Sequence, residues 1–262
     1  MSEVHPTAIV DPTAFLDKGV TVGPYAIVGR NAKIGRGTSI GAFAVIGPNT
    51  TMGESNRVYP HAVVGEDPQD LKYGGEETEL LVGDRNIFRE FVTVHRGTGE
   101  GGGKTVIGSG NLFMAYCHVA HDCIIGNGVV MANAATLAGH VEVHDHAVIG
   151  GLVGVHQFVR IGAHAMVGAL SAVAKDIPPF VTAVVTREGK RALFGLNLIG
   201  LRRRGFSKET IDVLKKAYRL LQDTSITVPE LVRKLKNELE SLPEVEYMAR
   251  FLETSRRGVE RT

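Results

Sequence analysis

Aliphatic residues recur at every sixth position from the start of the chain. The first eleven are Val4, Val10, Leu16, Val22, Val28, Ile34, Ile40, Ile46, Met52, Val58 and Val64. A small or β-branched residue stands four places after nearly every one of them, and glycine often follows directly. A six-residue unit is too short for a pair of helices and suits a short strand with a turn. Three units then form a triangular coil of 18 residues whose repeated side chains point inward.

Two interruptions divide this period. Residues 66–81 are polar, yet Val82 returns in register, as expected for a loop extruded from a coil. The glycine-rich segment 97–103 shifts the register by one residue, and the period resumes at Ile107 and lasts to Val173. That segment lacks the GK[ST] ending of a phosphate-binding loop, so we interpret it as a flexible excursion. The period predicts nine or ten coils between residue 4 and about residue 178.

The pattern becomes helical from about residue 190. Ser207 is a candidate N-cap, Thr227 and Glu230 form a capping box, and Pro243 opens a further helix. The sequence therefore predicts a mainly β protein with two domains: a parallel β-helix over residues 1–186 and a small α-helical domain over 187–262.

Charge is distributed unevenly between these two parts. Residues 1–186 carry 12 Lys/Arg against 17 Asp/Glu, whereas residues 187–262 carry 17 against 11, within a net charge of +1. A net charge near zero gives no reason to expect nucleic acid as a partner. The basic C-terminal part indicates either solvated helix faces or an acidic partner or phosphate ligand.

The N-terminus and the cysteines indicate a cytoplasmic protein. The first residues lack the basic and apolar regions of a signal peptide, and no run of about 18 apolar residues predicts a membrane span. Cys117 and Cys123 are too few for a disulfide scaffold, and both fall at inward positions, so we expect them to fill the core.

Histidines gather in the second half of the repeat. Seven of the ten lie between residues 118 and 164, and none occupies an inward position. We expect His144, His146 and His164 to lie on the outer face, at solvent or in a subunit contact. His121 differs because Asp122 follows it and can orient the ring.

His121 is the candidate general base. A neutral imidazole, whose ordinary pKa is about 6.5, can take a proton from a sugar hydroxyl at neutral pH. Gly139 lies 18 residues later, one coil further on the same face, so its N–H can stabilise a developing oxyanion. The hydroxyl can attack a thioester directly, and no serine or cysteine nucleophile is needed.

Several segments carry a more specific resemblance. They are residues 69–73 (QDLKY), 95–98 (HRGT), 120–123 (AHDC), 137–140 (LAGH), 155–158 (VHQF) and 201–206 (LRRRGF). Across nearly the whole chain these segments resemble UDP-N-acetylglucosamine O-acyltransferases, which belong to the hexapeptide-repeat transferases and open lipid A biosynthesis. The resemblance implies a left-handed β-helix, a homotrimer with active sites between subunits, and acyl transfer, of a 3-hydroxyacyl chain in particular, from acyl carrier protein to the 3-position of a UDP-amino sugar. No cofactor or metal is implied, because phosphopantetheine arrives on the carrier protein.

The resemblance also implies roles for individual residues. His121 would be the base, Asp122 its partner and Gly139 the oxyanion donor. The implied substrate-binding residues are Gln69, Asp70, Lys72, His118, His140, His156, Gln157, Asn197, Arg203 and Arg204. Among these, Lys72 would contact the donor or sugar nucleotide, and Asn197 with the two arginines would hold the nucleotide or the phosphopantetheine phosphate. Three consecutive arginines cannot share one helix face, so at least one would face solvent or the carrier protein.

Three positions depart from the family pattern or vary within it. Residues 185–192 look longer and more charged than the usual link, and Ile199 stands where familiar members have a Glu near the nucleotide. Ala169 aligns with the residue that limits acyl length, and a small side chain there would leave room for a longer chain.

Other functions remain open at this point. The acceptor could bear an amine in place of the 3-hydroxyl. A γ-class carbonic anhydrase shares the coil, but its pattern needs two histidines five apart, and no pair here has that spacing. The histidine cluster also allows a zinc site of another kind, and a purely structural β-helix would not explain His121 and Asp122.

Overall fold

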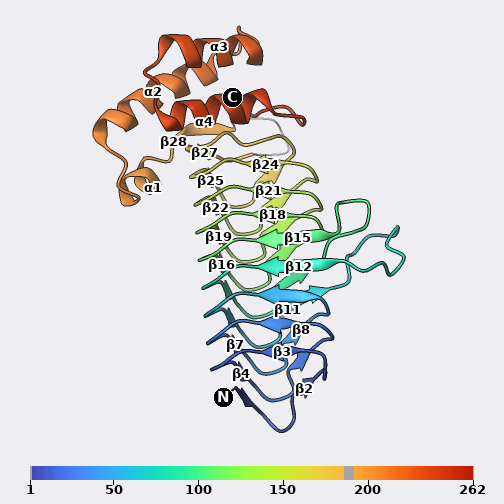
Figure 1. Ribbon diagram of the computed structural model, residues 1–262. Coiled ribbons are helices and arrows are strands. Elements are labelled where there is room, and N and C mark those ends of the chain that lie inside the picture. The colour runs from blue at the N-terminus through green and yellow to red at the C-terminus, as the bar shows by residue number, and fades with distance from the viewer. Residues whose placement is uncertain (1, 186–191, 262) are drawn as a thin grey trace.

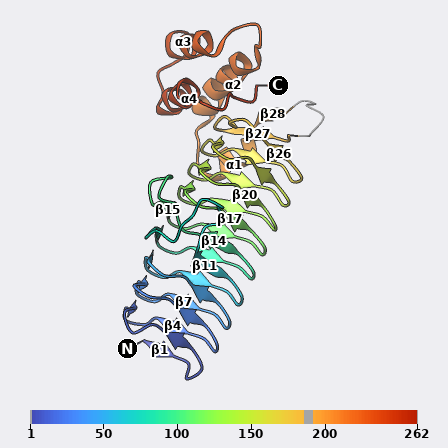
Figure 2. The same cartoon turned by 90° about the vertical axis from the view of Figure 1, so that its right-hand side faces the viewer.

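In the computed structural model, which describes residues 2–185 and 192–261, the chain forms the predicted left-handed parallel β-helix with helices at its C-terminal end. The coils run along one axis from the N-terminus to the helices (Figures 1 and 2). Each coil contributes one short strand to each of three parallel sheets, which are the three faces of a triangular prism.

The three sheets are named A, B and C here. Sheet A contains β1 (Glu3–Val4), β4 (Thr21–Val22), β7 (Ser39–Ile40), β10 (Arg57–Val58), β13 (Ile87–Phe88), β16 (Leu112–Phe113), β19 (Val130–Met131), β22 (Val148–Ile149), β25 (Met166–Val167), β27 (Val181–Ala183) and β28 (Leu193–Leu196). Sheet B contains β2 (Ile9–Val10), β5 (Ile27–Val28), β8 (Val45–Ile46), β11 (Val63–Glu66), β14 (Thr93–His95), β17 (His118–Val119), β20 (Thr136–Leu137), β23 (Gly154–Val155) and β26 (Ala172–Val173). Sheet C contains β3 (Phe15–Leu16), β6 (Lys33–Ile34), β9 (Thr50–Met52), β12 (Glu79–Val82), β15 (Lys104–Ile107), β18 (Ile124–Ile125), β21 (Glu142–Val143) and β24 (Arg160–Ile161).

The six-residue period accounts for the core. The repeated aliphatics are buried from Val22 onward, and the small residues four places later are buried with them. Val119 pairs with Leu137, one coil of 18 residues further on. Cys117 and Cys123 are free and fully buried, as expected for core residues. Val4 is 44% exposed because the first coil has no neighbour below it.

From residue 19 onward, nearly every turn between sheets contains one residue in the left-handed backbone region. At most turns that residue is not glycine; examples are Phe43 (φ 58°), Asp122 (φ 59°) and His140 (φ 62°). This conformation costs energy for an L-residue and persists because the ladders on both sides hold the turn. Its consequence is that side chains at these positions form columns along the three corners of the prism.

Both predicted interruptions are loops that leave the coil on the same side (Figure 1). One joins β11 to β12 and spans 67–78, and the other joins β14 to β15 and spans 96–103. Each is followed by a strand that returns to sheet C in register with the coils around it.

The helical part begins later than predicted. Residues 193–196 form β28, which pairs antiparallel with β27 and closes the last coil, so the expectation of helix from about residue 190 is wrong for this segment. The free backbone groups at the edge of sheet A favour a paired strand here, and this pairing overrides the weak helical pattern of the sequence. The proposed domain boundary at 186/187 and most of the link at 185–192 lie outside the described residues.

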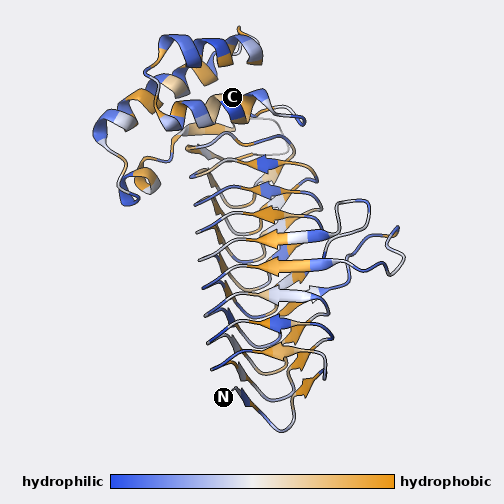
Figure 3. Ribbon diagram, viewed as in Figure 1, coloured by the Kyte–Doolittle hydropathy of each residue, from blue (hydrophilic) through white to orange (hydrophobic). Residues whose placement is uncertain are grey.

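Four helices follow: α1 (Leu198–Arg203), α2 (Lys208–Gln222), α3 (Val228–Glu238) and α4 (Pro243–Glu253). Ser207 and Thr227 accept hydrogen bonds from Thr210 N–H and Glu230 N–H, as the capping patterns predicted. Apolar and polar positions alternate around these helices (Figure 3), and their apolar faces pack on one another and on the last coils. No helix among the described residues is long and apolar enough to cross a bilayer.

Candidate active site

His121 lies at the corner where sheet B turns into sheet C. It follows β17, and Asp122, the next residue, occupies the left-handed position of that turn. His140 and Phe158 occupy the same position in the next two coils, so Asp122, His140 and Phe158 form one column. The rings of His140 and Phe158 are stacked with centroids 4.5 Å apart. The repeat itself therefore brings residues 18 apart into contact.

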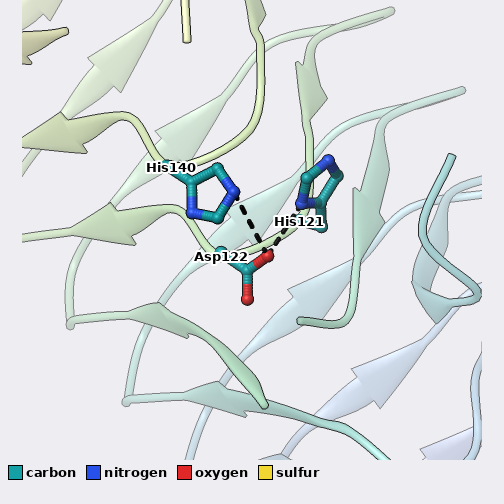
Figure 4. Close-up of side chains that lie close together, drawn as sticks. All are labelled: His121, Asp122 and His140. Atoms are coloured by element: carbon teal, nitrogen blue, oxygen red, sulfur yellow. Dashed lines mark hydrogen bonds and ion pairs between the residues drawn. The ribbon is translucent and has the colours of Figure 1, made fainter. Parts of the chain in front are cut away.

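The His121 ring is oriented by the carboxylate beside it. Nδ1 of His121 lies 2.8 Å from Oδ2 of Asp122, and Nε2 of His140 approaches the same oxygen to 3.8 Å. Figure 4 shows both rings directed toward this carboxylate from neighbouring turns. With the Nδ1 proton donated to Asp122, Nε2 of His121 keeps its lone pair and can accept a proton.

Asp122 is buried and held from several sides. Its side chain is 1% exposed. Its two oxygens accept hydrogen bonds from the N–H and the hydroxyl of Thr98, and its own N–H donates to Thr105 Oγ1. A Cβ on Gly101 would stand 2.1 Å from the carboxylate carbon. The interpretation of 97–103 as a flexible excursion is therefore wrong for Thr98 and Gly101, because they form the wall of the Asp122 pocket.

Gly139 makes room for the His121 ring. A Cβ at this position would stand 2.5 Å from Cε1 and 2.8 Å from Nε2 of His121, so any larger residue would displace the ring. Among the described residues the Gly139 N–H donates to no acceptor. This unpaired N–H beside the imidazole can donate a hydrogen bond to an acceptor atom of a ligand.

The 67–78 loop reaches the same corner. Asp70 Oδ2 lies 4.0 Å from Nε2 of His121, on the side of the ring opposite Asp122. Lys72 pairs with Glu100 of the other loop at 3.0 Å, and both side chains are largely exposed. The two loops therefore meet above His121, and Lys72 is free to exchange this exposed partner for a ligand.

A groove of about 550 Å³ lies beside the turn of His121, on the outer face of sheet B. Its floor is built from the small outward residues of three successive strands, Thr136, Gly154 and Ala172. Gln69, His118 and His156 line its edge. Thr93 Oγ1 lies 2.7 Å from Nδ1 of His118 and fixes that ring.

Neighbouring imidazoles stay neutral near pH 7. Burial lowers the pKa of His118, and the nearby His121 lowers it further. Burial is also the main reason that the pKa of His140 is lowered, against the opposing effect of Asp122. The pKa of His95 falls to about 4, through burial and then through His118. The site can therefore offer hydrogen bonds from neutral rings.

Some of the predicted substrate-binding residues lie away from His121 in the structure. Asn197 caps α1: its side chain accepts from Gly200 N–H and donates to the carbonyl of His164. Arg203 ends α1 and Arg204 caps it, and both are exposed, as is Ile199. Asn197 and Arg204 lie against turns between sheets C and A, so one chain does not bring these residues to His121. Gln157 is exposed in the turn after β23, at the corner of His121.

Ala169 lies at the corner between sheets A and B. It is exposed in the turn between β25 and β26, at the far edge of sheet B from His121. The groove floor runs between these two edges. The structure thus separates Ala169 from His121 by the width of one face.

The outer-face expectation for three histidines needs correction. His144, His146 and His164 do point outward, but His144 Nδ1 is 2.6 Å from the Tyr247 hydroxyl of α4. The His164 ring packs against Phe206 at 4.9 Å, and His146 packs against His164 at 5.0 Å. Segments of the same chain, which the six-residue period does not reveal, cover these rings.

Three residues that make contacts in the site have no role predicted from the sequence. Thr98 belongs to the segment 95–98 without a predicted role, Phe158 follows Gln157 in the segment 155–158, and Arg257 belongs to none of the motifs. Nη2 of Arg257 lies 3.1 Å from Nδ1 of His156, about one hundred positions away in the chain. No local pattern marks such a distant contact.

His121, Asp122 and His140 are also the one group of metal-ligand residues that the described part of the chain brings together, with one ligand atom from each within 4.8 Å. Both Asp122 oxygens already accept hydrogen bonds from Thr98. The geometry thus favours a proton relay over a tetrahedral ion site, in which each ligand atom must point at the metal.

A triangular β-helix with a histidine–carboxylate pair at one corner and an apolar groove beside it defines a hexapeptide-repeat transferase. Matching family models cover most of the chain. The model described as "Udp N-acetylglucosamine O-acyltransferase; Domain 2" matches residues 176–260, and that of the bacterial transferase hexapeptide matches residues 31–66 and 104–139.

Full-length relatives identify the family. The acyl-[acyl-carrier-protein]--UDP-N-acetylglucosamine O-acyltransferase of Alkalilimnicola ehrlichii is 54% identical over 99% of both chains, and that of Myxococcus xanthus is 51% identical over 100% of both. The solved structure of LpxA from Acinetobacter baumannii superposes with a TM-score of 0.94 at 42% identity, covering 98% of this chain and 99% of that one. This chain belongs to the UDP-N-acetylglucosamine O-acyltransferase family, and it is an acyltransferase.

Proposed function

We propose that this enzyme transfers an acyl chain, a 3-hydroxyacyl chain in particular, from acyl carrier protein to the 3-hydroxyl of UDP-N-acetylglucosamine, as the first step of lipid A biosynthesis. The observation that carries this proposal is the 2.8 Å contact between His121 Nδ1 and a fully buried carboxylate, because it leaves Nε2 as the proton acceptor.

The proposed reaction proceeds by direct attack. Nε2 of His121 takes the proton of the sugar hydroxyl as its oxygen adds to the thioester carbonyl. The carbonyl oxygen becomes an oxyanion, which the Gly139 N–H stabilises. Collapse of this intermediate breaks the carbon–sulfur bond, and the imidazolium returns its proton to the leaving thiolate. General-base help of this kind contributes about 10²–10⁴-fold.

The groove on sheet B supports the choice of an acyl donor. Its apolar floor of small residues begins beside His118, next to the base, and runs toward the edge that carries Ala169. An extended hydrocarbon would bury apolar surface there, at about 0.8 kcal/mol per CH₂. In this proposal Ala169 limits chain length, and Ala169→Met would shift the preference toward shorter donors.

A homotrimer would complete the site. Asn197 and Arg204 lie at a corner different from that of His121. In this proposal they and Arg203 therefore reach the nucleotide from a neighbouring copy. The chain that carries the base would also contact the sugar nucleotide, through Asp70, Lys72, His140 and Gln157. The exposed Ile199 on α1 offers no carboxylate to that nucleotide.

Other parts of the proposal follow from the sequence. No bound cofactor is required, because the carrier protein brings its own phosphopantetheine. We infer a cytoplasmic location, because cysteines such as Cys117 and Cys123 stay unpaired in a reducing compartment.

The decisive experiment supplies purified protein with 3-hydroxyacyl carrier protein thioesters of several lengths and with either UDP-N-acetylglucosamine or its 3-amino analogue. We expect an ester product from the hydroxyl sugar. Product from the 3-amino sugar alone would show that the acceptor carries an amine in place of the 3-hydroxyl. Absence of product with both, together with a stoichiometric bound metal found by mass spectrometry, would replace acyl transfer by a metal function at His121, Asp122 and His140.

A further inference from the structure

A second pocket lies beside the active-site corner, on the side of sheet C. It has a volume of about 440 Å³, and His140, Phe158, Arg160, Arg256 and Arg257 line it together with Glu142. His140 also approaches Asp122, so one ring borders both the catalytic corner and this pocket. The arginines at 256 and 257 come from the segment after α4, which has no part in the proposed reaction.

The buried residue Asp176 holds this segment on both sides of the two arginines, through its carboxylate on one side and its backbone on the other. Asp176 is fully buried, and its side chain accepts from Ser255 Oγ and from the Arg160 guanidinium. Its backbone N–H donates to the carbonyl of Gly258, and its carbonyl accepts from Glu260 N–H.

Arg160 adds two further ties. Its guanidinium donates to Thr254 Oγ1 and to the carbonyl of Phe251, both at 2.8 Å. The backbone that carries Arg256 and Arg257 is thereby fixed before any ligand arrives, which lowers the entropy cost of binding.

The side chains of Arg256 and Arg257 take no part in these hydrogen bonds. Arg256 donates no hydrogen bond within the described residues, and Arg257 makes one, to His156 Nδ1. A guanidinium has five N–H donors, so most of theirs remain available. The acidic residue in the lining, Glu142, lies 3.7 Å from Nε2 of His144, and the pKa of Glu142 is lowered first by that histidine.

We propose that Arg256 and Arg257 form a phosphate-ester subsite beside His140. Two preorganised guanidinium groups with free donors suit phosphate oxygens, which they can bind in pairs. The inference rests on the proposed function, because both substrates carry such a group: the acceptor has a pyrophosphate, and the donor has the phosphodiester of phosphopantetheine.

The first test reads the subsite without any acyl transfer. Calorimetric titration with inorganic pyrophosphate at low salt is expected to show binding to wild type and a loss of tenfold or more in the Arg256→Ala/Arg257→Ala variant, since hydrogen bonds to charged groups are worth about 1.5–3 kcal/mol. Absence of binding to wild type, or equal binding by the variant, would overturn the subsite whether or not the enzyme is active.

The second test identifies the source of the phosphate. Dissociation constants are measured for UDP-N-acetylglucosamine and for acyl carrier protein with and without its phosphopantetheine arm. If the double variant binds only the nucleotide sugar more weakly than wild type does, the subsite binds the pyrophosphate. If it binds only the carrier protein with its phosphopantetheine arm more weakly, the subsite binds the phosphodiester. Equal weakening of both carriers would overturn the subsite in favour of an acidic protein surface.

Two controls separate charge from structure. Arg36→Ala removes an exposed arginine in the N-terminal coils and is expected to leave all these constants unchanged. Arg256→Lys keeps the charge but loses the paired donors, so it should recover part of the affinity. Thermal unfolding of each variant should match wild type, because neither arginine side chain takes part in the Asp176 network.

Discussion

Two corners of the same prism use one backbone for different purposes. At the corner between sheets A and B, Tyr25, Phe43, His61, Phe91 and Tyr116 occupy the left-handed turn position, and their rings stack at 5.0–5.1 Å. At the corner between sheets B and C, the equivalent column is Asp122, His140 and Phe158. The coil sets where these side chains stand, and their chemistry decides what each corner can do.

The loops create the second difference. Phe43, on the first corner, is 49% exposed, whereas the Asp122 side chain is 1% exposed because Thr98 and Gly101 close over it. A buried carboxylate beside an imidazole orients that ring strongly, because little water competes for the hydrogen bond. We therefore predict that the coil is catalytic at the turn from which the irregular loop excludes water.

The largest expected effect comes from removing the base. His121→Ala should lower kcat by about 10²–10⁴-fold, the usual contribution of a general base. The matched control is His61→Ala, which removes an exposed histidine from the other corner and should leave kcat unchanged. Comparable losses in both variants would show that histidines at the corners act through folding.

Gly139→Ala is expected to have the next largest effect. The added Cβ would stand 2.5 Å from His121 Cε1, and a displacement of about 1 Å can cost 10²-fold in rate. Gly151 holds the equivalent register position at the corner between A and B, where a Cβ would meet only Asn133 O, at 3.3 Å. Gly151→Ala should keep kcat within about twofold of wild type, and an equal fall in the two variants would contradict the role of Gly139.

A smaller loss should follow from opening the Asp122 pocket. Thr98→Val removes the hydroxyl that donates to Asp122 Oδ2 and leaves a buried carboxylate oxygen with one partner fewer, so we expect about a tenfold lower kcat. Thr98→Ser keeps the hydroxyl and should restore most of the rate. The pH profile of kcat should move in the valine variant, whereas a purely structural defect would lower the rate equally at every pH.

The smallest expected effect is on stability, and it concerns the corner between sheets C and A, where His164 lies. Burial lowers the pKa of His164 to about 4, with further lowering by His146 and Arg204. The unfolded chain takes up this proton near pH 6.5, so between pH 6.5 and 4 it binds more protons than the folded chain. The free energy of unfolding should therefore fall as the pH falls through this range.

Urea unfolding at pH 7.5 and at pH 5 measures that fall. His164→Phe keeps a ring against Phe180 and Phe206 but removes the titrating group, so its loss of stability between the two pH values should be smaller. The same loss in wild type and variant would show that other groups, such as His95 with its pKa of about 4, account for it.

The sequence by itself determined the coil. A strict six-residue period leaves one arrangement of inward side chains, so the core, the register and the two extruded loops follow from the period alone. His121, Asp122 and Gly139 could be predicted together for the same reason, because residues 18 apart must lie in adjacent coils.

Only the tertiary structure decided which distant segments meet the coil. Thr98 closes on Asp122, Tyr247 bonds His144, Arg257 reaches His156, and residues 193–196 pair with β27 instead of forming a helix. These contacts join segments whose separation follows no period, and they form because buried or edge polar groups must find partners. The local sequence pattern does not predict which distant partner a polar group will bind.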